Sequence, residues 1–188
     1  MEYKKIKNAQ QLLEYMDENI VYGVYDYENN IKHLGNCNNF ENYVANTWKL
    51  SSPTNIIKHG IGICYDQVEL ERDFFKKQGY VFKTFFIWFK CNRANNYPTH
   101  TYLVFKDKNT SAWYWFEHSD FNNKGIHKYN SLNQAIIAQK TSHIKFAKSY
   151  RKSKTDASKI EIFEYDNIAY GTKFGDFIDT ILKTGKRV

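Results

Sequence analysis

Apolar residues recur at helical spacing in the middle of the chain. The positions that carry this period are Ile61, Cys64, Val68 and Phe75. They predict a helix that begins at Cys64 and ends before Gly79, because glycine commonly follows the last helical turn. Gly60 and Gly62 precede this helix, and they allow a tight turn and a close approach of the backbone to a ligand.

The segments after Gly79 have the composition of strands. Residues 81–90 are apolar on both faces, which is typical of a strand buried in the middle of a sheet. Residues 100–105 and 113–117 are rich in aromatic and β-branched side chains, and the polar residues between them predict a hairpin. We therefore expect an antiparallel sheet that includes all three segments.

Capping signals and apolar spacing predict further elements on both sides of this region. Five helices are expected: one that begins at the Asn8 and Gln11 capping signal, one over 40–48, one from Ser52 and Pro53 to Gly60, one that begins at the Ser131 and Gln134 capping signal, and one over 174–182. We also expect a connector over 121–129 and a strand over 160–165. Their order predicts one α+β domain over residues 1–188. Its parts are a core at 52–120, an N-terminal helical segment at 1–51 and a C-terminal helix-strand-helix segment at 121–188.

Composition narrows the class of protein. A chain of 188 residues with 14 Phe and 15 Tyr can bury a substantial core. The sequence has no apolar run long enough for a membrane span and no apolar signal core, so we expect a cytoplasmic protein without a membrane partner. The odd number of cysteines, three, indicates reduced thiols. The net charge is +7, and we interpret its densest basic run, Lys145 to Lys159, as a solvated loop.

Candidate chemistry lies on the three central segments. A helix N-terminus favours a thiolate, and Cys64 opens the predicted helix. His100 is the first residue of the predicted strand at 100–105. If the hairpin closes symmetrically between Lys108 and Asn109, His100 faces Glu117 at a Cβ separation of about 5 Å. A slip of one residue would oppose His100 to His118 instead, and Asp120 is the alternative third member.

These motifs resemble those of the transglutaminase-like superfamily of papain-type cysteine enzymes. The matching runs are G-I-C-Y-D at 62–66, H-T-Y-L-V-F at 100–105 and W-Y-W-F-E at 113–117. The family pattern at the first run is roughly G-V-C-x-D, and its cysteine corresponds to Cys64. They are also similar to runs in uncharacterised bacterial and phage proteins of that superfamily. The family usually has Asp where this chain has Glu117, so the carboxylate is kept on a longer side chain.

The resemblance implies a papain-like core and a Cys64–His100–Glu117 triad. Such a triad would transfer an acyl group from an amide of a protein or peptide substrate through a thioester, with the Cys64 amide and a second donor holding the oxyanion. Water is the default acceptor, which favours hydrolysis over cross-linking. We expect no cofactor and no metal. Further candidates for the substrate cleft are Gly62, Tyr65, Asp66, Gln67, Asn96 and His118.

Other interpretations remain open at this stage. Asp66 and Gln67 follow the nucleophile so closely that they can simply stabilise the helix N-terminus, and we expect Asp66 to point away from the sulfur. A domain of this fold could instead be a catalytically inactive binding module, in which Cys64 is buried away from His100. A nucleic-acid binder that stacks bases on its aromatic strands ranks third, because aromatic residues at strand spacing are usually core.

Overall fold

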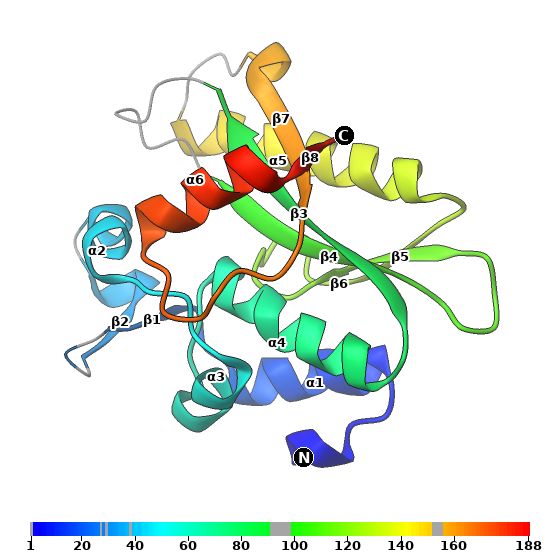
Figure 1. Ribbon diagram of the computed structural model, residues 1–188, viewed down its shortest axis with the longest axis horizontal. Helices are drawn as coiled ribbons and strands as arrows, with labels where there is room; N and C mark the ends of the chain where they lie inside the picture. Colours follow the sequence, from blue (N-terminus) through cyan, green and yellow to red (C-terminus); the bar gives the residue numbers. More distant parts are fainter. Residues whose placement is uncertain (1, 27, 29, 38, 91–98, 152–155) are drawn as a thin grey trace.

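An antiparallel sheet of six strands lies at the centre of the protein (Figure 1). The computed structural model describes residues 2–26, 28, 30–37, 39–90, 99–151 and 156–188. The strand order is β6-β5-β4-β3-β7-β8. The bounds are β3 Val81–Phe89, β4 His100–Lys106, β5 Trp113–Glu117, β6 Gly125–Tyr129, β7 Ile160–Tyr165 and β8 Lys186–Arg187. Strand β3 has neighbours on both sides, as its apolar sequence predicted.

Helices cover both faces of this sheet (Figure 1). Their bounds are α1 Ala9–Asn19, α2 Phe40–Thr47, α3 Pro53–His59, α4 Cys64–Lys77, α5 Leu132–Arg151 and α6 Phe174–Thr184. Helices α1 and α4 pack on the face that carries Leu103 and Phe105, whereas α5 packs on the face that carries Tyr102 and Val104. A small hairpin of β1 Gly23–Tyr25 and β2 Ile31–His33 lies outside the main sheet. The fold is therefore mixed α+β, as expected.

Local signals set several helix boundaries. The side chain of Asn8 accepts a hydrogen bond from the Gln11 amide at 2.9 Å and caps α1. Ser52 caps α3 in the same way, Pro53 is its first residue, and Gly60 ends it with a positive φ of 65°. Gly79 follows α4 with a φ of 68°. The predicted starts of α1, α3 and α4 and the predicted ends of α3 and α4 are confirmed.

Two expectations outside the core segments were wrong, and one short strand was not predicted. Residues 125–129 form strand β6, which pairs with β5, where we expected a connector. Helix α5 continues to Arg151 through the first half of the basic run, where we expected a loop. It does so because Ala147 lies on its buried side while its lysines face solvent. The short strand β8 pairs with β7 and was not predicted.

The register of the central hairpin also differs from the expected one. Leu103 pairs with Phe116 and Lys106 with Trp113, which shifts the strands by two residues from symmetric closure at Lys108. A shift of two keeps each side chain on its expected face, whereas a shift of one would reverse it. His100 and Glu117 therefore remain on the same face of the sheet.

Among the described residues, no helix is both long enough and apolar enough to cross a membrane.

Candidate active site

The turn before Cys64 is held by the segment that follows α1. Val21 and Ile61 form a parallel bridge, in which the Val21 amide donates to the Gly60 carbonyl at 2.8 Å and the Gly62 amide donates to the Val21 carbonyl at 3.2 Å. A Cβ atom on Gly62 would lie 2.9 Å from the Cβ of Asp66. Glycine is thus required at position 62 by the close approach of α4. This arrangement fixes Cys64 as the first residue of the helix.

Asp66 stabilises the N-terminus of α4. Its carboxylate accepts hydrogen bonds from the Trp48 indole at 2.9 Å, the Ser51 amide at 2.9 Å and the Ile63 amide at 3.1 Å. Burial raises the pKa of Asp66 to about 7, although these three donors oppose the rise. Both oxygens are bonded to donors other than Cys64, so the capping interpretation of Asp66 is confirmed.

His100 and Glu117 form a buried pair. The Nε2 atom of His100 lies 2.9 Å from Oε2 of Glu117, and the two residues are only 8% and 2% exposed. Glu117 accepts three further hydrogen bonds, from the Trp115 indole at 3.2 Å, the Ser119 hydroxyl at 3.0 Å and the Asp120 amide at 2.8 Å. Four donors thus converge on one carboxylate.

The electrostatics of this pair favour its charged form. Burial lowers the pKa of His100, but the charge of Glu117 and the hydrogen bonds of the ring to Cys64 and Glu117 raise it well above the usual value. Burial likewise raises the pKa of Glu117, but the charge and hydrogen bond of His100 outweigh it and lower the pKa. The arrangement therefore favours an imidazolium beside a carboxylate near neutral pH.

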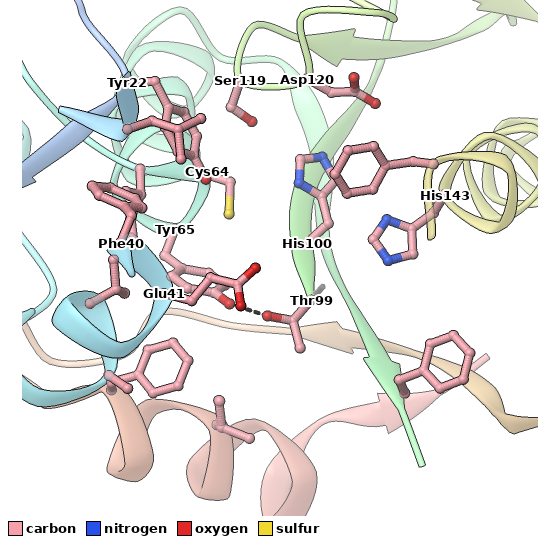
Figure 2. Close-up of a pocket in the computed structure, with 18 of the residues that line it drawn as sticks. Tyr22, Phe40, Glu41, Cys64, Tyr65, Thr99, His100, Ser119, Asp120 and His143 are labelled. Atoms are coloured by element: carbon pink, nitrogen blue, oxygen red, sulfur yellow. Dashed lines mark hydrogen bonds between the residues drawn. The ribbon is translucent and has the colours of Figure 1, made fainter. Parts of the chain in front are cut away.

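The sulfur of Cys64 and the ring of His100 face each other across a pocket (Figure 2). Because Nε2 is held by Glu117, Nδ1 is the ring nitrogen available to Cys64. The ring of His143, on α5, stacks near the His100 ring with centroids 6.1 Å apart. The pocket has a volume of about 720 Å³. Much of its lining is apolar and comes from α2, α6 and the residues that flank Cys64, including Phe40, Val44, Ile63, Tyr65, Phe174 and Ile178.

Asp120 does not take the place of Glu117. Its carboxylate accepts from the Asn122 amide at 3.0 Å and from the Asn123 side chain at 2.7 Å, while its own amide supports Glu117. Glu117 is therefore the acid that the fold pairs with His100.

The remaining predicted cleft residues lie in different surroundings. Tyr65 lines the pocket and is hydrogen-bonded to Thr99. Gln67 lies behind the turn, where it donates to the Gly62 carbonyl at 2.8 Å and contacts Nδ1 of His118 at 2.7 Å. His118 in turn lies 3.2 Å from Asp17. Gln67 and His118 thus support the turn from a side where they do not line the pocket, and Asn96 lies outside the described residues.

Sequence reasoning missed several residues of this site. Trp115 lies two positions before Glu117 on the same face of β5, so strand alternation could have revealed it. Trp48 and Tyr22 come from segments with no such signal, and their tertiary contacts alone bring them to α4. The part of the chain that the structure describes contains no group of three or more His, Cys, Asp or Glu residues arranged to hold a metal ion.

No family model matches the chain, and no curated protein matches its sequence.

Proposed function

We propose that the protein is a cysteine-dependent acyl-transfer enzyme of the transglutaminase-like type, with Cys64 as nucleophile, His100 as acid and base, and Glu117 as the residue that orients His100. One observation carries the proposal. A cysteine at a helix N-terminus faces an imidazole whose far nitrogen is held at 2.9 Å by a buried carboxylate. Nucleophile, base and orienting acid in this relation are the requirements of covalent acyl transfer.

The proposed reaction begins from a thiolate and an imidazolium. The sulfur of Cys64 attacks the carbonyl carbon of an amide, a C–S bond forms, and the electron pair of the carbonyl moves to its oxygen. The tetrahedral intermediate collapses, the C–N bond breaks, and His100 gives its proton to the leaving amine. Water then attacks the thioester and loses a proton to His100. The acid leaves, and the thiolate and the imidazolium are restored.

We favour hydrolysis by this enzyme, as a peptidase, amidase or deamidase, over cross-linking. Water is present at high concentration, whereas an amine acceptor needs a binding site of its own. The large apolar lining of the pocket suits the side chains of a protein or peptide substrate.

The two other classes lack a supporting observation. Taking two charged groups out of water is costly even when they are paired. A binding module that had lost catalysis would gain nothing from a buried His100–Glu117 pair directed at Cys64. Base stacking requires exposed rings, but Trp115 and Phe116 are 2% and 0% exposed. Trp88, Trp113 and Tyr114 are half-buried, so none of these rings is an exposed stacking surface.

The proposal is tested by the pH dependence of iodoacetamide alkylation, mapped by mass spectrometry. We expect Cys64 to react well below pH 8 in the wild type and to lose this reactivity in His100→Ala. Cys37, a half-buried cysteine that is not in a disulfide, is the internal reference. The matched variant is His59→Ala, which removes an imidazole that stacks on Tyr25 and does not line the pocket.

Equal behaviour of Cys64 and Cys37 in both proteins would remove the basis of the catalytic proposal. If the ion pair is found, glutamine-containing peptides and simple amides are the substrates to screen, with released ammonia or amine as the readout. Incorporation of an added amine in place of water would assign the enzyme to cross-linking instead.

A further inference from the structure

Tyr22 lies beside the nucleophile although it is 42 positions earlier in the sequence (Figure 2). It follows Val21 directly, and the bridge between Val21 and Ile61 aligns this segment with the turn that leads into Cys64. The Tyr22 ring packs between Phe40 and Phe121, at centroid distances of 6.3 and 6.2 Å. Backbone and ring are thus both held in place.

The side chains of Tyr22 and Cys64 lie next to each other in the pocket that both line (Figure 2). The Tyr22 hydroxyl interacts there with the side chain and the backbone amide of Cys64. Cys64 is the first residue of α4, and a first-turn amide has no acceptor within its own helix. The space in front of this amide is the place where a carbonyl oxygen lies when its carbon is attacked by the sulfur. The Tyr22 hydroxyl therefore borders the position of the developing oxyanion.

The state of this hydroxyl suits a hydrogen-bond donor. Burial and the nearby charge of Cys64 raise the pKa of Tyr22 well above its usual value, so the phenol keeps its proton at neutral pH. A neutral phenol can donate to an oxyanion without adding a charge of its own. The turn residues that flank Cys64 offer few alternatives, because the Ile63 amide donates to Asp66 and the Gly62 amide donates to Val21.

We infer that Tyr22 is a catalytic residue that supplies the second donor of the oxyanion hole, with its hydroxyl and the Cys64 amide binding the carbonyl oxygen of the substrate together. This inference rests on the proposed acyl-transfer function. The carbonyl oxygen of the substrate lies beside both the Cys64 amide and the Tyr22 hydroxyl. The hydroxyl rotates its proton toward this oxygen while the ring stays between Phe40 and Phe121.

The test compares two probes of the same sulfur in wild type and Tyr22→Phe. p-Nitrophenyl acetate acylates a cysteine through a tetrahedral oxyanion, whereas iodoacetamide alkylates it by displacement without one. We expect acetylation of Cys64 to be about 100-fold slower in Tyr22→Phe, the order of loss for one oxyanion donor. The rate of Cys64 alkylation is expected to change by less than about 3-fold, because that reaction forms no oxyanion. Tyr114→Phe is the matched control, because Tyr114 stacks on Phe105 and does not line the pocket.

The outcomes separate this inference from the function on which it rests. Acetylation of Tyr22→Phe at the wild-type rate would show that the hydroxyl is not a donor, and faster acetylation would show that it obstructs the site. Either result overturns the inference while the triad stands. Wild-type Cys64 that is inert to both probes would overturn the acyl-transfer function and the role of Tyr22 with it.

Discussion

Replacing Glu117 by Gln isolates the contribution of its charge to the site. Glutamine keeps the size of the side chain and an oxygen that can accept from His100, but it removes the negative charge 2.9 Å from Nε2. Two unit charges about 4 Å apart interact by about 4 kcal/mol at an effective dielectric constant of about 20. One pKa unit corresponds to about 1.4 kcal/mol, so an interaction of this size shifts a pKa by about 3 units. Opposite charges at such distances commonly shift a pKa by about 1–3 units.

The expected result follows from the direction of the shift. Glu117 raises the pKa of His100, and the imidazolium in turn supports the thiolate. In Glu117→Gln the imidazolium loses this support, so the pH at which Cys64 alkylation is half maximal should rise by about 1–3 units. At a pH below the midpoints of both proteins, the alkylation should then be about 10- to 1000-fold slower, because thiolate formation changes tenfold for each pH unit below its midpoint.

The assay is the pH profile of iodoacetamide alkylation from pH 4 to 10, with Cys37 as the reference in each sample. Glu161→Gln is the matched control, because Glu161 lies on strand β7 of the same sheet and forms ion pairs with Lys90 and Arg187. Thermal unfolding of each variant shows whether the fold is retained. A Glu117→Gln profile that coincides with that of the wild type would refute the argument that this charge supports the ion pair.

Three further predictions concern α4 and the turn before it. Gly62→Ala should lower the free energy of unfolding by about 1–3 kcal/mol and slow Cys64 alkylation, because the new Cβ meets Asp66. Gly35→Ala is the control and should change neither, because the space around Gly35 is open; urea unfolding and alkylation rates measure both effects. Asp66→Ala leaves three donors without an acceptor and should cost at least about 3 kcal/mol in the free energy of unfolding. Glu71 has a pKa raised well above 4.5 by burial and by Glu117, so its stabilising contribution is present below pH 4.5 and lost as pH rises. Glu71→Gln should therefore gain stability over the wild type by about 1.4 kcal/mol per pH unit above about pH 5, and a constant difference in urea unfolding between pH 5 and 8 would contradict the raised pKa.

Features that depend on contacts within a few residues could be predicted from the sequence. The starts of α1 and α3 rest on Asn8 and Ser52, whose side chains bond to amides three residues later. The start of α4 followed from glycine positions and apolar spacing. These signals need no knowledge of the rest of the fold, and they place Cys64 at a helix N-terminus.

The register of the hairpin depended on turn geometry that the pattern of side chains does not specify. The carboxylate of Asp107 accepts from the amides of Asn109 and Thr110, and the Asp107 amide donates to the Ala112 carbonyl. The turn therefore closes later than a symmetric loop would. Alternation alone still placed His100 and Glu117 on one face, which is why the pair was predicted although the register was not.

Contacts between distant segments could not be predicted. Tyr22 reaches Cys64 only because a single bridge aligns Val21 with Ile61, and Trp48 reaches Asp66 only because α2 ends beside α4. Strand β6 was missed because it is half-buried and pairs only with β5, so its side chains show no clear alternation. In each case the deciding interaction joins residues for which the sequence carries no local signal.

A second carboxylic acid near the triad bears on how the site holds its charge. Glu71 lies two helical turns after Cys64 and is 2% exposed, and its Oε2 atom has no hydrogen-bond partner. Glu117, by contrast, accepts four hydrogen bonds. When two buried carboxyl groups are close, ionisation of one opposes ionisation of the other. The group that accepts more hydrogen bonds carries the charge. Glu117 is therefore ionised and Glu71 neutral, so that Glu117 supports the imidazolium of His100 and Glu71 adds no negative charge beside Cys64.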